Sequence, residues 1–191
     1  SVGGMINNVK TFASILMPGV QHMRHTHLPE HKFVSGQPES GGDLANDLER
    51  IASNFGPENI AACIVEPIAG STGTLVPPKG YLQKLREICD KHGILLIFDE
   101  VITGWGRTGS SFAGHEFGVT PDIMTMAKAT TNGVVPMGVV ACKDEIYDAV
   151  MDASPMGSVE LFHGYTYSGI PVAVAAALAV QDIFEKDDIF N

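Results

Sequence analysis

Basic residues are scarce in this sequence, which has 12 Lys and Arg against 22 Asp and Glu and a formal net charge of −10. A chain with this balance repels phosphate backbones and anionic lipid surfaces, which argues against nucleic acid or a membrane as its main partner. No apolar run reaches the length of a transmembrane helix, and the first residues show no signal-peptide pattern. We therefore expect no nucleic-acid or membrane partner.

Cysteine is also scarce, with three widely spaced residues, Cys63, Cys89 and Cys142, and no CxxC pair. An odd number without a signal peptide predicts free thiols in a reducing compartment such as the cytoplasm. The sequence has no GxSxG elbow, so a serine hydrolase site has no support. It also has no internal repeat and no low-complexity tract.

Hydrophobic residues make up 45% of the chain and charged residues 18%, which is typical of a globular domain. Apolar runs alternate with stretches of helical periodicity, and this alternation predicts an α/β fold with a mostly parallel sheet flanked by helices. The expected strands are 60–65, 94–98, 122–127 and 137–142, and the expected helices are 1–15, 43–55, 79–92, 144–151 and 171–184. The helix at 43–55 is expected to bury Leu44, Leu48, Ile51 and Phe55.

Two of the apolar runs lead into ionisable residues that could take part in catalysis. Residues 94–98 lead into Asp99 and Glu100, and residues 122–127 lead into Lys128. If both runs are parallel strands of one sheet, their carboxyl ends share an edge, where open α/β sheets bind ligands. An acid and an amine together suit pyridoxal 5′-phosphate (PLP), which needs a lysine for a Schiff base and a carboxylate for its pyridine nitrogen. An ordinary salt bridge at the edge of the sheet is the alternative.

Residues 104–109 match GxGxxG, which raises a nicotinamide or flavin site as another possibility. In such a site the first glycine follows the strand almost directly, and a helix begins within the motif. Here residues 99–103 intervene, and the sequence after Gly109 is a poor helix. The context therefore disfavours a dinucleotide site.

Four histidines lie close together, and their spacing could serve zinc: His22, His25, His27 and His31. Pro29 interrupts any helix and no cysteine is near, so a solvated loop without metal is the preferred interpretation.

Residues 163–171 stand just before a predicted helix and contain the aliphatic hydroxyl side chains of Thr166 and Ser168. Thr166 and Ser168 could receive a phosphate at the helix N-terminus, while simple capping, best done by Ser168, is the alternative. Glu66 ends a predicted strand, where it could line a pocket or make a structural contact. Trp105 could also line a pocket or simply pack.

Together these segments resemble one family, the class III aminotransferases, which are PLP enzymes of fold type I. The matching segments are 65–70, 98–109, 121–128 and 163–171, in the family's order and spacing. The resemblance covers the chain from about residue 60 onward and is weaker before it. The DEVI and HGYTYSG segments are similar to the ω-amino acid–pyruvate branch of that family.

The resemblance implies a role for particular positions. Lys128 would be the catalytic residue, forming the Schiff base with PLP and then carrying protons. Asp99 would pair with the protonated pyridine nitrogen, and Val101 would pack against one face of the ring. Ile102 stands where many relatives have glutamine, so a hydrogen bond to the cofactor hydroxyl would be absent.

The resemblance also implies a homodimer, because Thr166 would bind the cofactor phosphate in the other subunit and Tyr165 would add a backbone contact. The expected reaction moves an amino group from an ω-amino acid or amine to a keto acid such as pyruvate, in a ping-pong cycle. A decarboxylase or aminomutase of the same fold is an alternative, which carbon dioxide release or retention of the amino group would reveal. A non-catalytic interaction domain is another.

Residues 1–191 would form part of the PLP-binding large domain of such an enzyme. The family's earlier segment and its C-terminal small domain would lie outside this sequence. We therefore expect the 191-residue chain by itself to be incomplete as a catalyst.

Overall fold

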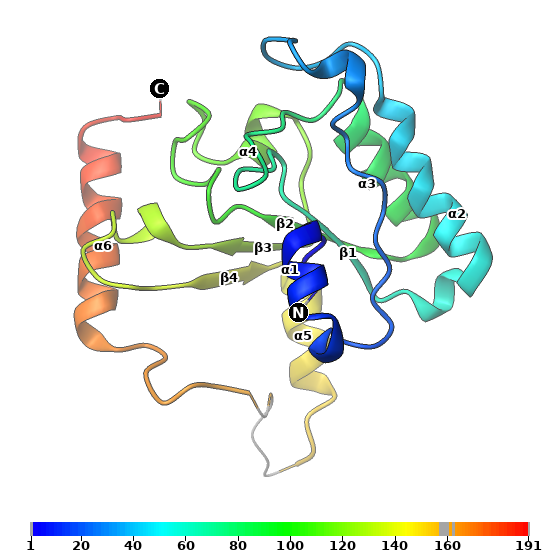
Figure 1. The fold of residues 1–191 in the computed structure, drawn as a ribbon. Coiled ribbons are helices and arrows are strands. Elements are labelled where there is room, and N and C mark those ends of the chain that lie inside the picture. Colours follow the sequence, from blue (N-terminus) through cyan, green and yellow to red (C-terminus); the bar gives the residue numbers. More distant parts are fainter. Residues whose placement is uncertain (1, 157–160, 162, 191) are drawn as a thin grey trace. The chain divides into compact units, whose positions relative to one another are not determined.

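The strand order of the sheet is β1-β2-β3-β4, in a computed structural model that describes residues 2–156, 161 and 163–190 (Figure 1). The chain divides into two compact units, residues 1–61 with 68–94, and residues 62–67 with 95–191, and each is described by itself. No helix in the described part of the chain is long and apolar enough to cross a membrane.

The first unit is helical. Its helices are α1 (Ile6–Thr11), α2 (Asn46–Phe55) and α3 (Tyr81–His92). The predicted helix at 1–15 is shorter than expected, because α1 ends at Thr11 and a separate 3₁₀ turn covers Ala13–Ile15. Helix α3 ends as predicted at Gly93, which has a φ of 67° and so adopts the left-handed conformation that glycine allows.

Helices α2 and α3 contact each other. The predicted apolar stripe of α2 is buried at Leu48 and Ile51, and Leu44 is buried in the 3₁₀ turn before it. Phe55 was predicted to belong to the same stripe, but it is 51% exposed. It is the last residue of α2, and Gly56, with a φ of 79°, turns the chain away directly after it.

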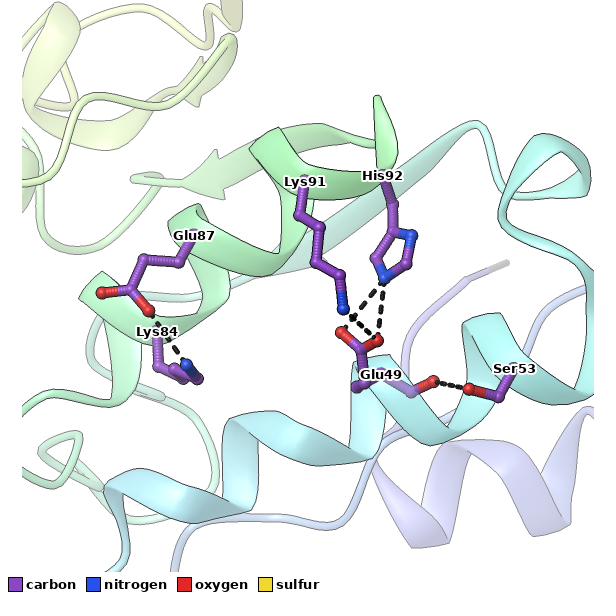
Figure 2. A network of polar contacts seen from close by, with 6 residues as sticks. All are labelled: Glu49, Ser53, Lys84, Glu87, Lys91 and His92. Carbon is purple, nitrogen blue, oxygen red and sulfur yellow. Dashed lines mark hydrogen bonds and ion pairs between the residues drawn. The ribbon is translucent and has the colours of Figure 1, made fainter.

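Charged side chains also connect α2 and α3, as Figure 2 shows. Lys91 Nζ and His92 Nε2, both on α3, lie 2.7 Å and 3.0 Å from Glu49 Oε1 on α2. Hydrogen bonds from Lys91 and then His92 hold the pKa of Glu49 below its ordinary value. The Lys91 side chain is 62% exposed and that of Glu49 34%, so solvent screens this pair, and such partly exposed pairs stabilise a protein by at most about 1 kcal/mol. The apolar stripes therefore contribute more to the packing of α2 on α3 than this network does.

A buried carboxylate fixes the loop before α2. Asp47 is 4% exposed, and its Oδ2 accepts hydrogen bonds from the backbone N of Arg24 (2.8 Å) and from Arg24 Nε (3.0 Å). Arg50 Nε lies 3.5 Å from the other oxygen. Burial raises the pKa of Asp47, but the hydrogen bonds and charge of Arg24, together with Arg50, outweigh burial and lower it overall. The folded state therefore favours the ionised form of Asp47.

Replacing Asp47 with asparagine is expected to lower the free energy of unfolding at pH 7 by about 1–2 kcal/mol. Because the folded pKa lies below the unfolded value of about 3.9, this stabilisation is present above that pH and is lost as pH falls through the folded pKa. Urea unfolding at pH 7 and near pH 3 measures the difference, which should shrink at the lower pH. Asp43→Asn, at an exposed position of the same unit, is the control. An Asp47→Asn deficit that does not change with pH would contradict this account.

His31 differs from the prediction of a solvated histidine loop. Its side chain is buried, with Nδ1 3.1 Å from Thr26 O and Nε2 3.4 Å from Ser40 Oγ. Both ring nitrogens are thereby used within the loop. The described ranges contain no group of three or more His, Cys, Asp or Glu side chains that could hold a metal ion.

The second unit contains the sheet. Its strands are β1 (Ala62–Val65), β2 (Leu95–Asp99), β3 (Ile123–Met126) and β4 (Val139–Cys142), and its helices are α4 (Ala113–Glu116), α5 (Asp144–Asp152) and α6 (Pro171–Lys186). Strands β1, β2 and β3 are parallel, and β4 is antiparallel to β3. The predicted mostly parallel α/β fold is confirmed. Leu96 and Phe98 of β2 are fully buried, as expected for a central strand.

Candidate active site

The carboxyl ends of β2 and β3 lie at the same edge of the sheet. In the parallel pairing of these strands Asp99 is in register with Thr125, and Lys128 follows three residues later, two residues after the end of β3. Asp99 is the last residue of β2, so the acid and the lysine lie at the carboxyl ends of adjacent parallel strands. Open α/β sheets bind ligands at this edge.

The Asp99 carboxylate uses one of its two oxygens within the protein. Oδ1 accepts a hydrogen bond from the backbone N of Val101 (3.1 Å) and another from Thr125 Oγ1 (3.2 Å). Oδ2 has no partner among the described residues. The side chain is half-buried, and one oxygen thus remains available to a ligand with a hydrogen-bond donor.

Lys128 begins a 3₁₀ turn, Lys128–Thr130, directly after β3. Its φ is 47°, a left-handed conformation that is uncommon for residues other than glycine and that often occurs at functional sites. The backbone N of Gly133 donates to Lys128 O (3.1 Å), and that of Thr130 donates to Ala127 O (3.0 Å). These bonds hold the turn, while the side chain of Lys128 is exposed and has no ion-pair partner among the described residues.

Trp105 contacts the turn that contains Lys128. Its Nε1 donates to Thr130 Oγ1 at 2.9 Å, and its ring lies 4.9 Å from that of Phe112 and 6.0 Å from that of Phe184. These contacts show that Trp105 packs within the protein, and its role in lining a pocket stays a prediction. Trp105 thereby links the loop after β2 to the turn after β3.

Glu100 is a site-adjacent residue to which the sequence assigned no role. It is fully buried, and its carboxylate accepts from Thr103 Oγ1 (2.6 Å) and from the backbone N of Ala113 (2.9 Å) and Gly114 (2.8 Å). These bonds close the loop between β2 and α4. A second acid directly after a buried strand was the available signal, but two of its three partners, Ala113 and Gly114, lie more than ten residues away along the chain.

The remaining candidates from the strand ends and the loop are half-buried. Val65 pairs with Phe98, so Glu66 and Asp99 each directly follow that pair of residues on neighbouring strands. Val101 and Ile102 lie in the loop after β2, beside Asp99 in the chain. The three residues are therefore near the edge that carries Asp99.

Tyr165 and Thr166 lie in an exposed turn before α6. The backbone N of Ser168 donates to Tyr165 O (2.9 Å), and Ser168 Oγ accepts from the backbone N of Tyr165 (3.3 Å). The capping role considered for Ser168 is thus wrong, because its hydroxyl closes this turn and Ile170 occupies the N-cap position. The structure records no contact of Thr166 with Asp99 or Lys128 among the described residues, although α6 itself contacts the Lys128 turn.

The segment 104–109 forms turns, with positive φ at Trp105, Gly106 and Gly109. No helix begins within it, since α4 starts only at Ala113. The dinucleotide-binding context is therefore not met, as the sequence indicated.

The chain matches the family described as Aminotransferase class-III over residues 1–191. It is 58% identical to an omega-aminotransferase of Caulobacter vibrioides, over 100% of this chain and 43% of that protein. It is 52% identical to a beta-alanine–pyruvate aminotransferase of Pseudomonas aeruginosa, over 99% of this chain and 42% of that protein.

Solved structures agree with this match. A 6-fold mutant of a thermostable omega transaminase from Pseudomonas jessenii has a TM-score of 0.85 at 35% identity, over 98% of this chain and 43% of that chain. A thermostable omega-transaminase from Thermomicrobium roseum has a TM-score of 0.80 at 42% identity, over 91% of this chain and 38% of that chain. The chain thus spans less than half the length of these relatives, and it belongs to the class-III aminotransferases.

Proposed function

We propose that this chain forms the cofactor-binding part of a PLP-dependent transaminase. The expected reaction moves an amino group from an ω-amino acid or amine to a keto acid such as pyruvate. The names of the relatives support this substrate class, since they include an omega-aminotransferase and a beta-alanine–pyruvate aminotransferase. Because the chain spans 43% of the first of these proteins, the activity is proposed for the whole protein.

The residues at the edge of the sheet fit PLP. Lys128 offers an exposed amine, and Asp99 offers a carboxylate oxygen without a partner among the described residues. When bound, PLP supplies an electron sink for negative charge that develops on the substrate carbon. Asp99 would accept a hydrogen bond from the pyridine nitrogen and keep that nitrogen protonated. Lys128 would hold the cofactor covalently through Nζ.

Lys128 would also act as the acid–base group of the reaction. With Nζ free, Lys128 would take a proton from the substrate carbon and later return one. A positioned acid–base group of this kind contributes about 10²–10⁴-fold in rate. The left-handed turn that carries Lys128, with a φ of 47°, would fix the backbone from which Nζ acts.

The other candidates would shape the site around these two residues. Val101 would pack against one face of the ring, with Ile102 and Glu66 lining the pocket from the same edge of the sheet. Trp105 would support the Lys128 turn. Tyr165 and Thr166, exposed before α6 in this chain, would bind the cofactor phosphate in the partner subunit of a homodimer. Residues 1–191 would thus belong to one PLP-binding large domain.

The single observation that carries this proposal is the placement of Asp99 and Lys128 at the ends of adjacent parallel strands. Its test is reduction with borohydride after incubation with PLP, followed by peptide mass mapping. We expect one pyridoxyl adduct, on Lys128. The test is made on the 191-residue chain and on a full-length chimaera, in which residues 1–191 replace the matching segment of the Caulobacter vibrioides relative.

The chimaera separates two questions: whether Lys128 is the residue that holds PLP, and whether residues 1–191 alone are enough to bind it. An adduct in the chimaera but not in the 191-residue chain would mean that segments outside residues 1–191 are needed to hold PLP. Absence of an adduct in both forms, or an adduct on a lysine other than Lys128, would refute the assignment of the site.

A further inference from the structure

Two neighbouring acids, Asp99 and Glu100, use their oxygens differently. Both oxygens of Glu100 accept hydrogen bonds, from Thr103, Ala113 and Gly114, and its side chain is fully buried. Asp99 receives both of its donors on Oδ1 alone. Both oxygens of Glu100 are therefore used inside the protein. Asp99 is held through Oδ1, and its Oδ2 is available to a ligand.

The two donors to Asp99 come from different elements of the chain. Val101 N belongs to the loop that follows β2, and Thr125 Oγ1 belongs to β3. Thr125 stands in register with Asp99 in the parallel pair, so its hydroxyl reaches the carboxylate across the strands at 3.2 Å. A carboxylate with donors from two directions on one oxygen is restricted in its side-chain rotation, which fixes where the second oxygen points.

We propose that Thr125 is a positioning residue for Asp99: its hydroxyl orients the carboxylate so that Oδ2 is directed to the pyridine nitrogen of PLP. This inference rests on the proposed function. Thr125 acts through Asp99 and does not itself touch the cofactor. A purely structural alternative exists, since threonine is a common strand residue, and the experiment must separate the two.

The test is a titration of PLP into cofactor-free full-length chimaera carrying substitutions at the two positions. Thr125→Val keeps the shape of the side chain and removes the hydroxyl, while Thr125→Ser keeps the hydroxyl. Loss of one hydrogen bond to an ionised group is expected to weaken PLP binding about tenfold in the valine variant. The serine variant should bind PLP within about threefold of the parent protein.

A double-mutant cycle with Asp99→Asn decides how Thr125 acts. If Thr125 works through the carboxylate, Thr125→Val should change the affinity of the Asp99→Asn protein by less than about twofold. A tenfold loss from Thr125→Val in both backgrounds would show a structural effect and overturn the inference. So would unchanged affinity in the single Thr125→Val variant.

The outcomes also separate this inference from the proposed function. Normal PLP affinity in Thr125→Val together with a large loss in Asp99→Asn would refute the role of Thr125 and leave that of Asp99 intact. Normal affinity in Asp99→Asn would instead refute the proposed role of Asp99, and the inference about Thr125 would fail with it. Melting temperatures of the cofactor-free variants identify any protein that has lost its fold.

Discussion

Replacing Lys128 with alanine is expected to lower kcat for transamination in the full-length chimaera by about 10³-fold or more. The substitution removes both the amine that holds PLP and the acid–base group that moves the proton. Every turnover would depend on both roles of Lys128, so a large loss of rate is expected. The measurement is pyruvate-dependent transamination of an ω-amino acid, together with the visible absorption of the bound cofactor.

The control for this experiment is another exposed lysine of the same unit. Lys186 lies at the end of α6, and Lys186→Ala should leave the activity near that of the parent protein. Added free amine offers a further check, since a small amine can restore proton transfer without restoring the covalent link to PLP. An active Lys128→Ala protein whose cofactor absorption matches that of the parent would contradict the assignment.

Replacing Glu100 with alanine is expected to lower the free energy of unfolding by about 3–5 kcal/mol. The change leaves the backbone N–H groups of Ala113 and Gly114 and the Thr103 hydroxyl without their acceptor. It also leaves a space at a fully buried position. Urea unfolding monitored by circular dichroism measures the loss, which is a large part of the stability of a typical domain.

Two control variants, Glu100→Gln and Glu116→Ala, test whether the loss comes from the buried hydrogen bonds of Glu100. Glutamine keeps the volume of Glu100 but turns an –NH₂ donor toward one of the backbone donors, so a smaller loss is expected. Glu116 is exposed, accepts from Ser110 Oγ, and should change stability by less than about 0.5 kcal/mol when replaced by alanine. Equal losses for Glu100→Ala and Glu116→Ala would show that burial of Glu100 does not govern its contribution.

The fold and the positions of Asp99 and Lys128 could be predicted because they depend on local sequence. Apolar runs mark the strands, and the residue after each run marks the edge of a parallel sheet. The end of α3 at Gly93 was predictable for a similar reason, since a left-handed residue favours glycine. These features need only a few consecutive residues to be recognised.

Other features depended on contacts between distant residues and were not predictable. The contact of the Thr125 hydroxyl with Asp99 depends on the strand register, which the sequence does not give. Two of the donors to Glu100 lie on the far side of a long loop. Helical periodicity placed Phe55 in a buried stripe, but the turn at Gly56 exposes it. Ser168 is a residue type that often caps helices, but its hydroxyl accepts a hydrogen bond from the backbone N of Tyr165 instead.

The pairing of Asp99 with Thr125 has a consequence for how this sequence can change during evolution or engineering. Insertions or deletions within 107–110, outside α4 and away from Trp105 and the donors to Glu100, alter the length of a loop and leave the strand pairing intact. A single-residue insertion between Thr125 and Lys128 would instead shift the lysine relative to Asp99 while the pairing stays the same. Homologues and designed variants should therefore differ in length in the loop and keep the spacing of these three positions constant.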